Sequence, residues 1–458
     1  MSRRISRRRF MQASGVSAAA AGYWLTGGVT ESFAAQPGAN ARLNVALIGA
    51  GGRAEGNEQG VRGENIVALC DVDQSRARNV YNRYPRVTKY TDFRVMLDKQ
   101  KDIQAVVVST PDHTHFHASA MALQRGKHVY CEKPLTHSVW EARQLGLLAA
   151  KHRVATSMGN QGTAHDGLRT AAEIIRSGAI GEVREVHVWT DRPIWPQGIN
   201  RPKGRQEVPK TLTWDLWLGP APERPYNSAY VPFAWRGWWD FGTGALGDMA
   251  CHTMNMPFMA LRLSAPSAVS AEVVGGVNPE SAPARGVTVT YEFPARGQGL
   301  PALRLYWYES PYQPGVPREK RVYRRPPANV LQGINNVSGS GCMIVGSRGK
   351  MYSGSDYGSS YTLLPARDFA DYRPPQRTIP RSPGHHAEWI RACKGGAAAM
   401  SNFTDYAGPL TEMVLLGNVA MRAGERIVWD SAKLQVTNVR GAAQYIRPPY
   451  RKGWEWNA

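Results

Sequence analysis

From Arg42 onward, short apolar runs alternate with helix-length amphipathic segments. The apolar runs have the length of buried strands; they are "LNVALIG", "NIVALCD", "DIQAVVVST", "KHVYCEK" and "RVATSMG". Between them, residues 74–84, about 112–125 and 138–152 have the spacing of helices. Strands that alternate with helices of this length predict a parallel, doubly wound α/β sheet over residues 42–158.

The alternation stops after about residue 159. A helix is expected in "HDGLRTAAEIIRSGAIGE", and late helices in "HHAEWIRACKG" and "GPLTEMVLLGNVAMRAG". Four later segments have the alternation of antiparallel strands: "VREVHVWTD", "SAVSAEVVGG", "VTVTYEF" and "ALRLYWYE". Residues 310–340 and 365–383 are rich in Pro, Arg and Gly and are expected to be loops. We therefore expect residues 159–458 to form an α/β domain with an open, largely antiparallel sheet.

The glycine-rich turn "LIGAGGRAEG" follows the first strand and precedes a helix. Gly49, Gly51 and Ala54 satisfy G-x-G-x-x-G/A, a pattern that brings a pyrophosphate close to helix N-terminal amides. Asp71 ends the second strand, where an acidic side chain bonds ribose hydroxyls and disfavours a 2′-phosphate. The pattern predicts NAD rather than NADP, with Gly52 and Arg53 of the same turn as further contacts. A tight turn without a ligand is the alternative.

The first 34 residues have the features of a twin-arginine export signal. Arg7, Arg8 and Arg9 precede a short apolar run, and "SFA" ends a small-x-small cleavage site at Ala34. Export to the periplasm is therefore expected; a basic disordered tail is the alternative. The formal charge of +20 would fall to about +16 without this segment. The remaining basic residues are scattered without a known nucleic-acid module, so a solvated surface is expected, without nucleic-acid binding or insertion into a membrane.

Three histidines at alternate positions, His113, His115 and His117, raise the question of a metal site. His113 and His117 have i, i+4 spacing, but a third ligand in a known metal pattern is missing. No metal is therefore expected. The five cysteines are widely spaced and include no CxxC pair, which excludes a disulfide framework as the basis of the fold.

"TPDHTH", "GKHVYCEKPL" and the glycine turn together resemble the Gfo/Idh/MocA oxidoreductases, the family of glucose–fructose oxidoreductase and inositol dehydrogenase. The resemblance implies a Rossmann domain followed by an α/β domain whose sheet often forms a face between subunits, hence a homo-oligomer. It implies nicotinamide contacts in the Thr-Pro-x-x-x-His and Glu-Lys-Pro motifs, which correspond to Thr110, Pro111, His115, Glu132, Lys133 and Pro134. His115 is expected in one wall of the nicotinamide pocket. Lys133 would lie between nicotinamide and substrate and stabilise charge on the reacting oxygen.

"GALGDMACHTMN" resembles the family's substrate motif of Asp, three residues and His. Asp248 and His252 are i, i+4 and share a helical face. The resemblance implies that His252 is the general base and that Asp248 holds a substrate hydroxyl or orients the imidazole. Without it, a capping Asp and a core His are equally plausible. Asn160, where the chain leaves the first domain, is either a cofactor contact or a hinge residue.

Seven of the fourteen tryptophans lie between Trp189 and Phe241. Aromatic rings stack on the apolar faces of sugars, but such a cluster can equally fill a core. The expected function is exported, NAD-dependent oxidation of a sugar or polyol hydroxyl with a tightly bound cofactor. The alternative is a glycoside hydrolase of the same family that works by transient oxidation and elimination. A non-catalytic sugar-binding protein on this scaffold is the third possibility.

Overall fold

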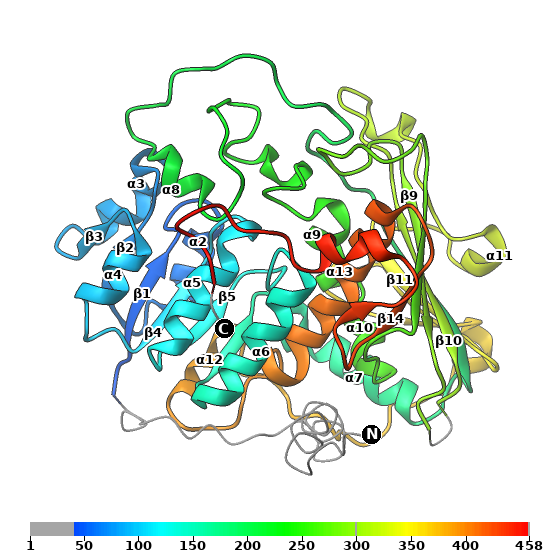
Figure 1. Ribbon diagram of the computed structural model, residues 1–458. Coiled ribbons are helices and arrows are strands. Elements are labelled where there is room, and N and C mark those ends of the chain that lie inside the picture. Colours follow the sequence, from blue (N-terminus) through cyan, green and yellow to red (C-terminus); the bar gives the residue numbers. More distant parts are fainter. Residues whose placement is uncertain (1–40, 298–299, 457–458) are drawn as a thin grey trace, which may run out of the picture.

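The computed structural model describes residues 41–297 and 300–456, and the expected export signal lies outside them. Two β-sheets stand side by side with helices packed around them (Figure 1). The first sheet is parallel, with strand order β3-β2-β1-β4-β5-β6. Its strands are β1 (Asn44–Ile48), β2 (Asn65–Cys70), β3 (Thr88–Tyr90), β4 (Ala105–Val108), β5 (His128–Cys131) and β6 (Thr156–Met158). This confirms the predicted doubly wound sheet.

Successive side chains of the buried strands point to opposite faces of the first sheet, and helices cover both faces. Val45 and Leu47 point to one hydrophobic core, and Ala46 and Ile48 point to another. One face is covered by α2 (Arg53–Val61), α3 (Gln74–Arg83) and α12 (His385–Cys393), and the other by α4 (Phe93–Lys99), α5 (Asp112–Gln124) and α6 (Val139–His152). Side chains set several helix starts; Asp73 caps α3, Asp92 caps α4, and Ser138 forms a capping box with Glu141 on α6.

The second sheet has nine strands in the order β13-β12-β11-β7-β10-β9-β8-β14-β15. Only β7 and β10 pair in parallel, which confirms the largely antiparallel sheet. The strands are β7 (Val183–Thr190), β8 (Ala268–Val273), β9 (Val287–Phe293), β10 (Leu303–Glu309), β11 (Gly341–Gly346), β12 (Lys350–Ser353), β13 (Thr362–Leu364), β14 (Ile427–Asp430) and β15 (Gln435–Val436).

Four helices lie between this sheet and the rest of the molecule. They are α7 (Asp166–Arg176), α9 (Gly244–Thr253), α10 (Asn255–Ala260) and α13 (Gly408–Ala423). Helix α13 contacts α6 of the first domain on one side and β8 and β9 on the other, so it joins the two layers (Figure 1). The remaining helices have five residues or fewer; they are α8 (Trp214–Leu218), α11 (Ala328–Leu331) and α14 (Ala443–Ile446).

The first domain is completed by a helix from far along the chain. Trp389 and Cys393 of α12 are fully buried in the same core as Leu47 and Tyr130. Lys394, at the end of α12, forms a 2.7 Å ion pair with Glu64. The helix itself was predicted, but nothing in the sequence assigned it to the first sheet.

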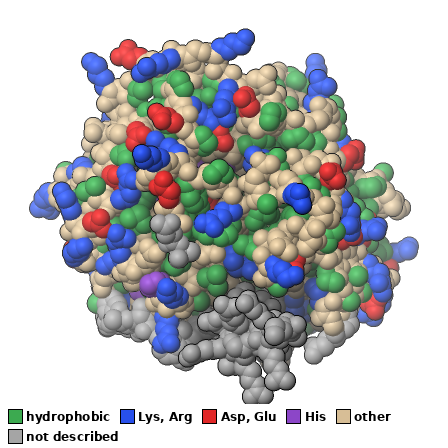
Figure 2. Space-filling view, in the orientation of Figure 1, with side chains coloured by type: hydrophobic (Ala, Val, Ile, Leu, Met, Phe, Trp, Pro, Cys, Tyr) green, Lys and Arg blue, Asp and Glu red, His purple; other side chains and the backbone are tan. Residues whose placement is uncertain are grey.

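Residues 191–241 form a lobe that runs along the upper edge of the molecule in Figure 1. The lobe has a small core of its own, in which Trp217, Trp235, Trp238 and Phe241 are buried. No helix in the described part of the chain is both long and apolar enough to cross a membrane. On the face drawn in Figure 2, Lys and Arg side chains are dispersed among acidic and apolar ones.

Candidate functional site

A cavity of about 570 Å³ opens at the carboxyl ends of the parallel strands. It lies where the strand order reverses between β1 and β4, the usual ligand position in doubly wound sheets. The turns after β1, β2, β4 and β5 line one side, and the lobe and helix α9 line the other. Gly49, Gly51, Gly52, Arg53, Asp71, Thr110, Pro111, Glu132, Lys133, Asp248 and His252 all line this cavity. Eleven of the thirteen expected site residues thus come together.

The glycine turn leaves no room for side chains. Gly49 has a φ of +79°, and a Cβ there would lie 2.9 Å from the carbonyl carbon of Ser109. A Cβ at Gly51 would lie 2.5 Å from the carbonyl oxygen of Arg76. The turn therefore packs closely against its neighbours and leads into α2, whose N-terminal amides face the cavity side. This cradle fits the pyrophosphate of a dinucleotide.

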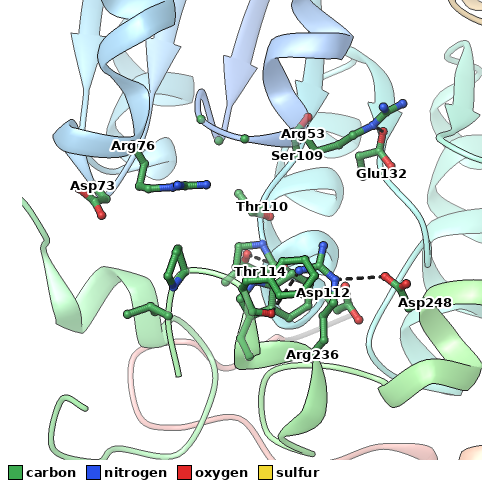
Figure 3. A pocket seen from close by; sticks show the side chains of 18 of the residues that line it. Arg53, Asp73, Arg76, Ser109, Thr110, Asp112, Thr114, Glu132, Arg236 and Asp248 are labelled. Carbon is green, nitrogen blue, oxygen red and sulfur yellow. Dashed lines mark hydrogen bonds and ion pairs between the residues drawn. The ribbon is translucent and has the colours of Figure 1, made fainter. Parts of the chain in front are cut away.

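Asp71 is fixed by backbone amides beside the glycine turn. Its carboxylate accepts hydrogen bonds from the amides of Ala50 at 2.7 Å, Gly51 at 3.2 Å and Asp73 at 2.9 Å. Burial raises the pKa of Asp71, while these amides act in the opposite direction. Arg76 lies at this same end of the cavity and is exposed (Figure 3).

A segment of the lobe covers this end of the cavity. We call residues 208–218 the strap. Its backbone bonds to the loop after β2, from the Gln74 amide to the Thr211 carbonyl at 3.0 Å and from the Thr213 amide to the Val72 carbonyl at 2.8 Å. The Leu212 and Trp217 side chains of the strap line the cavity. A dinucleotide on the glycine turn would therefore lie beneath the strap.

Residues near the chain end fasten the strap. The Arg451 guanidinium donates to the Asp215 carboxylate at 2.6 Å and to the Gly219 carbonyl, just after the strap, at 2.5 Å. Trp454 then packs against Arg94 of α4, with 4.2 Å between guanidinium and ring centroid, and its carbonyl contacts a ring nitrogen of His117 at 2.8 Å. The strap is thus held by the first domain both directly and through the tail.

Lys133 meets Asp248 across the cavity. The Lys133 ammonium donates to the Asp248 carboxylate at 2.7 Å and to its backbone carbonyl at 2.8 Å. Arg236 of the lobe donates to the same carboxylate oxygen at 3.1 Å (Figure 3). Burial would raise the pKa of Asp248, but Lys133 and Arg236 hold it well below its ordinary value. Asp248 is therefore a carboxylate shared by two cations.

His252 lies one helical turn beyond Asp248 on α9, on the same face. Burial, and then the charge of Lys133, lower the pKa of His252 to about 3, so its imidazole is neutral at pH 7. Its Nδ1 is buried and has no hydrogen-bond partner among the described residues. Tyr357 packs its ring edge-on against this imidazole, with 4.6 Å between ring centroids. The neutral imidazole can thus accept a hydrogen bond from a ligand hydroxyl.

Glu132 organises the floor between the glycine turn and Lys133. Its carboxylate accepts from Arg53 at 2.9 Å, from Asn57 at 3.0 Å and from Gln161 at 3.4 Å. Burial would raise the pKa of Glu132, but Arg53, Lys133 and Asn57 together hold it below its ordinary value. Figure 3 shows Arg53 and Glu132 side by side, on the opposite side of the cavity from Arg236.

The three histidines of α5 do not form a wall of the cavity. His113 contacts the carbonyls of Phe241 and Trp217, and His117 contacts that of Trp454. His115 places both ring nitrogens 2.8 Å from carbonyl oxygens, those of Pro134 and Thr110. The expected pocket contact of His115 is therefore corrected: it lies beneath the cavity and joins its two loops.

Asn160 also lies away from the cavity. It is fully buried, and its side-chain oxygen accepts from the Ser401 hydroxyl. Asn160 does not line the cavity, although its side-chain nitrogen is buried without a hydrogen-bond partner among the described residues, so its cofactor contact stays a prediction. Neighbouring Gln161 does line the cavity.

The tryptophan-rich region fills the core of the lobe and also lines part of the cavity. Trp195, Trp217 and Trp235 line the cavity, but all three are at least nine-tenths buried and help to fill the lobe. Trp189 belongs to a separate cluster on the second sheet. Sequence analysis did not single out Tyr357 or assign Arg236 to Asp248, since both contacts join distant segments. The only signal in the sequence for these contacts was that Arg236 lies among aromatic residues.

The hydroxyl of Thr110 independently tests whether the cavity fits a dinucleotide. This hydroxyl is buried, lines the cavity and lacks a hydrogen-bond partner among the described residues. A buried hydroxyl without a partner is costly, which favours a polar ligand group at this point. Together with the closely packed glycine turn, this fits a dinucleotide whose nicotinamide reaches Thr110 and Lys133.

Two family models match the chain. The model described as the oxidoreductase family, NAD-binding Rossmann fold, matches residues 43–160. The model of the same family's C-terminal alpha/beta domain matches residues 186–293. Both carry the name GFO_IDH_MocA.

Individual relatives agree with these matches. The inositol 2-dehydrogenase of Serratia proteamaculans is 30% identical over 152 residues, which are 32% of this chain and 44% of that protein. The chain aligns with less than half the length of the first curated relatives that it matches.

Among solved structures, the WlbA dehydrogenase of Bordetella pertussis, in complex with NADH and UDP-GlcNAcA, has a TM-score of 0.59 at 15% identity, covering 86% of this chain and 99% of that one. Levoglucosan dehydrogenase, in complex with NADH and levoglucosan, has a TM-score of 0.57 at 18% identity, covering 84% and 99%. At these identities the structural likeness shows a shared fold.

Proposed function

Because the chain belongs to the Gfo/Idh/MocA family of NAD-binding oxidoreductases, we propose that it oxidises a hydroxyl of a sugar or polyol with tightly bound NAD. One observation carries this proposal: Lys133, Asp248 and His252 converge on a single cavity beside the glycine turn. The inositol 2-dehydrogenase among the relatives supports a carbohydrate-like substrate.

The three side chains have complementary roles in this reaction. Neutral His252 accepts the hydroxyl proton at a ring nitrogen. Lys133 stabilises negative charge on the substrate oxygen, and Asp248, held by Lys133 and Arg236, positions the reacting ring through a hydroxyl. Bound NAD supplies the hydride acceptor. The Glu132–Arg53 pair orients the loops beside it, and the Thr110 hydroxyl, which has no partner among the described residues, would bond a polar group of the cofactor.

We further propose that the cofactor is retained through turnover and that the chain is exported by the twin-arginine route as a homo-oligomer. The strap and its fastening by Arg451 support retention. The arginine-rich N-terminus supports export. Free NAD is scarce outside the cytoplasm, so a second substrate would regenerate the retained cofactor. Detection of a mature chain that begins after Ala34 in a periplasmic fraction would test export.

A second candidate function is glycoside cleavage by transient oxidation and elimination. It is favoured by the apolar rim of the cavity, which includes the exposed side chains of Ile194, Phe233 and Tyr357. Net redox change is absent in such a reaction, which suits a retained cofactor.

The deciding experiment begins with purified protein after exhaustive dialysis. Mass spectrometry of the nucleotide released on denaturation should identify NAD at close to one per chain. A panel of sugars, polyols and aryl glycosides is then assayed without added nucleotide. Reduction of bound NAD by a sugar supports the dehydrogenase, whereas release of aglycone without net reduction supports the glycosidase.

Two results would reject the proposed chemistry. If the purified protein contained no nucleotide and did not bind NAD in a titration, both functions would be excluded. If Lys133→Ala and His252→Ala left every detected activity unchanged, a sugar-binding protein on a dehydrogenase scaffold would be the better assignment.

A further inference from the structure

Three large apolar side chains are exposed together at the mouth of the cavity. Ile194 is 50% exposed, Phe233 45% and Tyr357 39%, and all three line the cavity. Single exposed apolar residues are ordinary on protein surfaces, but a group of them at a cavity marks a binding surface. None of the other large apolar residues exposed in the described part of the chain lines this cavity.

Phe233 and Tyr357 flank the proposed reacting centre from different directions. Phe233 packs on Arg236, with 4.5 Å between guanidinium and ring centroid, and Arg236 in turn bonds Asp248. Tyr357 packs instead on His252, one helical turn further along α9. The exposed rings thus stand beyond the Asp248–His252 pair, outside the position of the ring that reacts.

Both aromatic side chains are held by close packing. Phe233 meets Trp195 edge-on, with 5.8 Å between centroids. Tyr357 packs its ring edge-on against His252, with 4.6 Å between centroids. A fixed aromatic surface loses little conformational entropy when it binds a ring. This distinguishes the rim from mobile surface side chains.

Polar groups stand among the apolar ones. Arg192 and Asp356 also line the cavity, and in the sequence they are close to the rim residues Ile194 and Tyr357. Arg192 forms an ion pair with Asp191 at 3.1 Å. Such alternation of apolar faces with charged hydrogen-bonding groups matches a sugar or an aryl glycoside, which has an apolar face and a polar edge.

We propose that Ile194, Phe233 and Tyr357 form an outer subsite for a second ring, the aglycone or second sugar of a glycoside. The reacting ring would occupy the inner position beside Lys133, Asp248 and His252. The physiological substrate is then a glycoside or disaccharide rather than a free monosaccharide. This inference rests on the proposed sugar chemistry, and it holds for either net reaction.

The test compares paired substrates that differ only in the outer group. Methyl and p-nitrophenyl glycosides of glucose, galactose, N-acetylglucosamine and N-acetylgalactosamine are assayed with the holoenzyme and its variants. Wild type should favour the p-nitrophenyl member of the accepted pair in kcat/KM. Phe233→Ala should lower that preference about tenfold and Ile194→Ala about threefold, in line with the loss of one ring contact or one aliphatic contact.

Ile199→Ala is the matched control. Ile199 is also an exposed isoleucine of the lobe, at 38%, but it does not line the cavity. This variant should keep the wild-type preference. The outer subsite would be overturned if Phe233→Ala lowered kcat/KM equally for both members of a pair, or if the wild type showed no preference for the p-nitrophenyl glycoside. Either result would leave the proposed oxidoreductase intact.

A binding measurement separates the two proposals if turnover is not detected. Titration of tryptophan fluorescence with each p-nitrophenyl glycoside should show saturable binding that weakens in Phe233→Ala. Saturable binding without turnover would reject the oxidoreductase and retain the subsite. Absence of binding would overturn the subsite. It would also be overturned if the rim variants left glycoside binding unchanged and altered only the oligomeric state measured by light scattering.

Discussion

At the scale of single residues, Lys133 and His252 are the two groups that we propose to carry the chemistry. We expect Lys133→Ala and His252→Ala each to lower kcat by about 10²–10⁴-fold, the usual range for removal of a positioned acid–base group. Bound nucleotide should be retained, because the glycine turn and the strap are untouched by either change. Stopped-flow absorbance of the bound cofactor measures the effect.

The exposed residue Lys151 of α6 provides the control, since Lys151→Ala removes the same charge far from the cavity. Wild-type rates are expected for it. A His252→Ala variant with undiminished kcat would show that another group accepts the proton.

His115 makes a different residue-scale prediction, about stability. Burial alone would lower its pKa, but the neighbouring Cys131 and Asp112 and the Pro134 carbonyl raise it to about 10. Because this lies above the ordinary value of 6.5, His115 stabilises the fold fully below about pH 6.5, and its contribution is lost as the pH rises toward 10. The urea midpoint of wild type should therefore fall over this range.

His115→Asn should have a lower midpoint at pH 6 and a smaller fall toward pH 10. His165→Asn, at a partly exposed position, should keep the wild-type slope. If His115→Asn retained the full pH dependence, another group would account for it.

Sequence reasoning located the residues whose roles depend on local spacing. Asp248 and His252 share a helical face by virtue of their i, i+4 spacing, and Lys133 follows a strand that ends at the ligand edge. Local spacing could not show that His115 and Asn160 do not line the cavity, because their partners, Pro134 and Ser401, are set by tertiary packing.

At the scale of elements, we expect the strap to control access to the cofactor end of the cavity, which Leu212 and Trp217 line. Arg451→Ala removes the ion pair to Asp215 and the bond to Gly219 while leaving the glycine turn intact. We expect the nucleotide to dissociate at least several-fold faster, because the strap is then held by fewer contacts, chiefly its bonds to Val72, Gln74 and His113. Release into a large excess of a competing nucleotide analogue measures the rate.

Lys452→Ala is the neighbouring control, since Lys452 is exposed and the strap makes no described contact with its side chain. Unchanged release from Arg451→Ala would mean that the backbone bonds alone hold the strap.

The elements of the first sheet were predictable because β-branched runs alternate with capped helices. In contrast, β11, β12 and β13 are short and lie in a Gly- and Ser-rich region with little periodicity. They become strands because β7 offers an edge to pair with. The covering role of the strap was also invisible, since its bonds reach back more than a hundred residues.

At the scale of the whole molecule, the first domain depends on the C-terminal half. A fragment of residues 42–160 lacks α12 and leaves Tyr130 and Leu47 without Trp389 and Cys393. We expect this fragment to lack a cooperative thermal transition in circular dichroism. Co-expression with residues 161–458 should restore one, whereas a cooperative transition in the isolated fragment would contradict the dependence on α12.

The fastening of the strap also has a consequence for how the molecule is made. Arg451 follows Asp215 by 236 residues, and a ribosome delivers the chain in sequence order. The strap therefore emerges long before the residue that fastens it. Until Arg451 is in place, the strap is held by fewer contacts, and we expect nucleotide to reach the glycine turn more easily. If the cofactor binds before the strap is fastened, a molecule exported in folded form would take its cofactor with it.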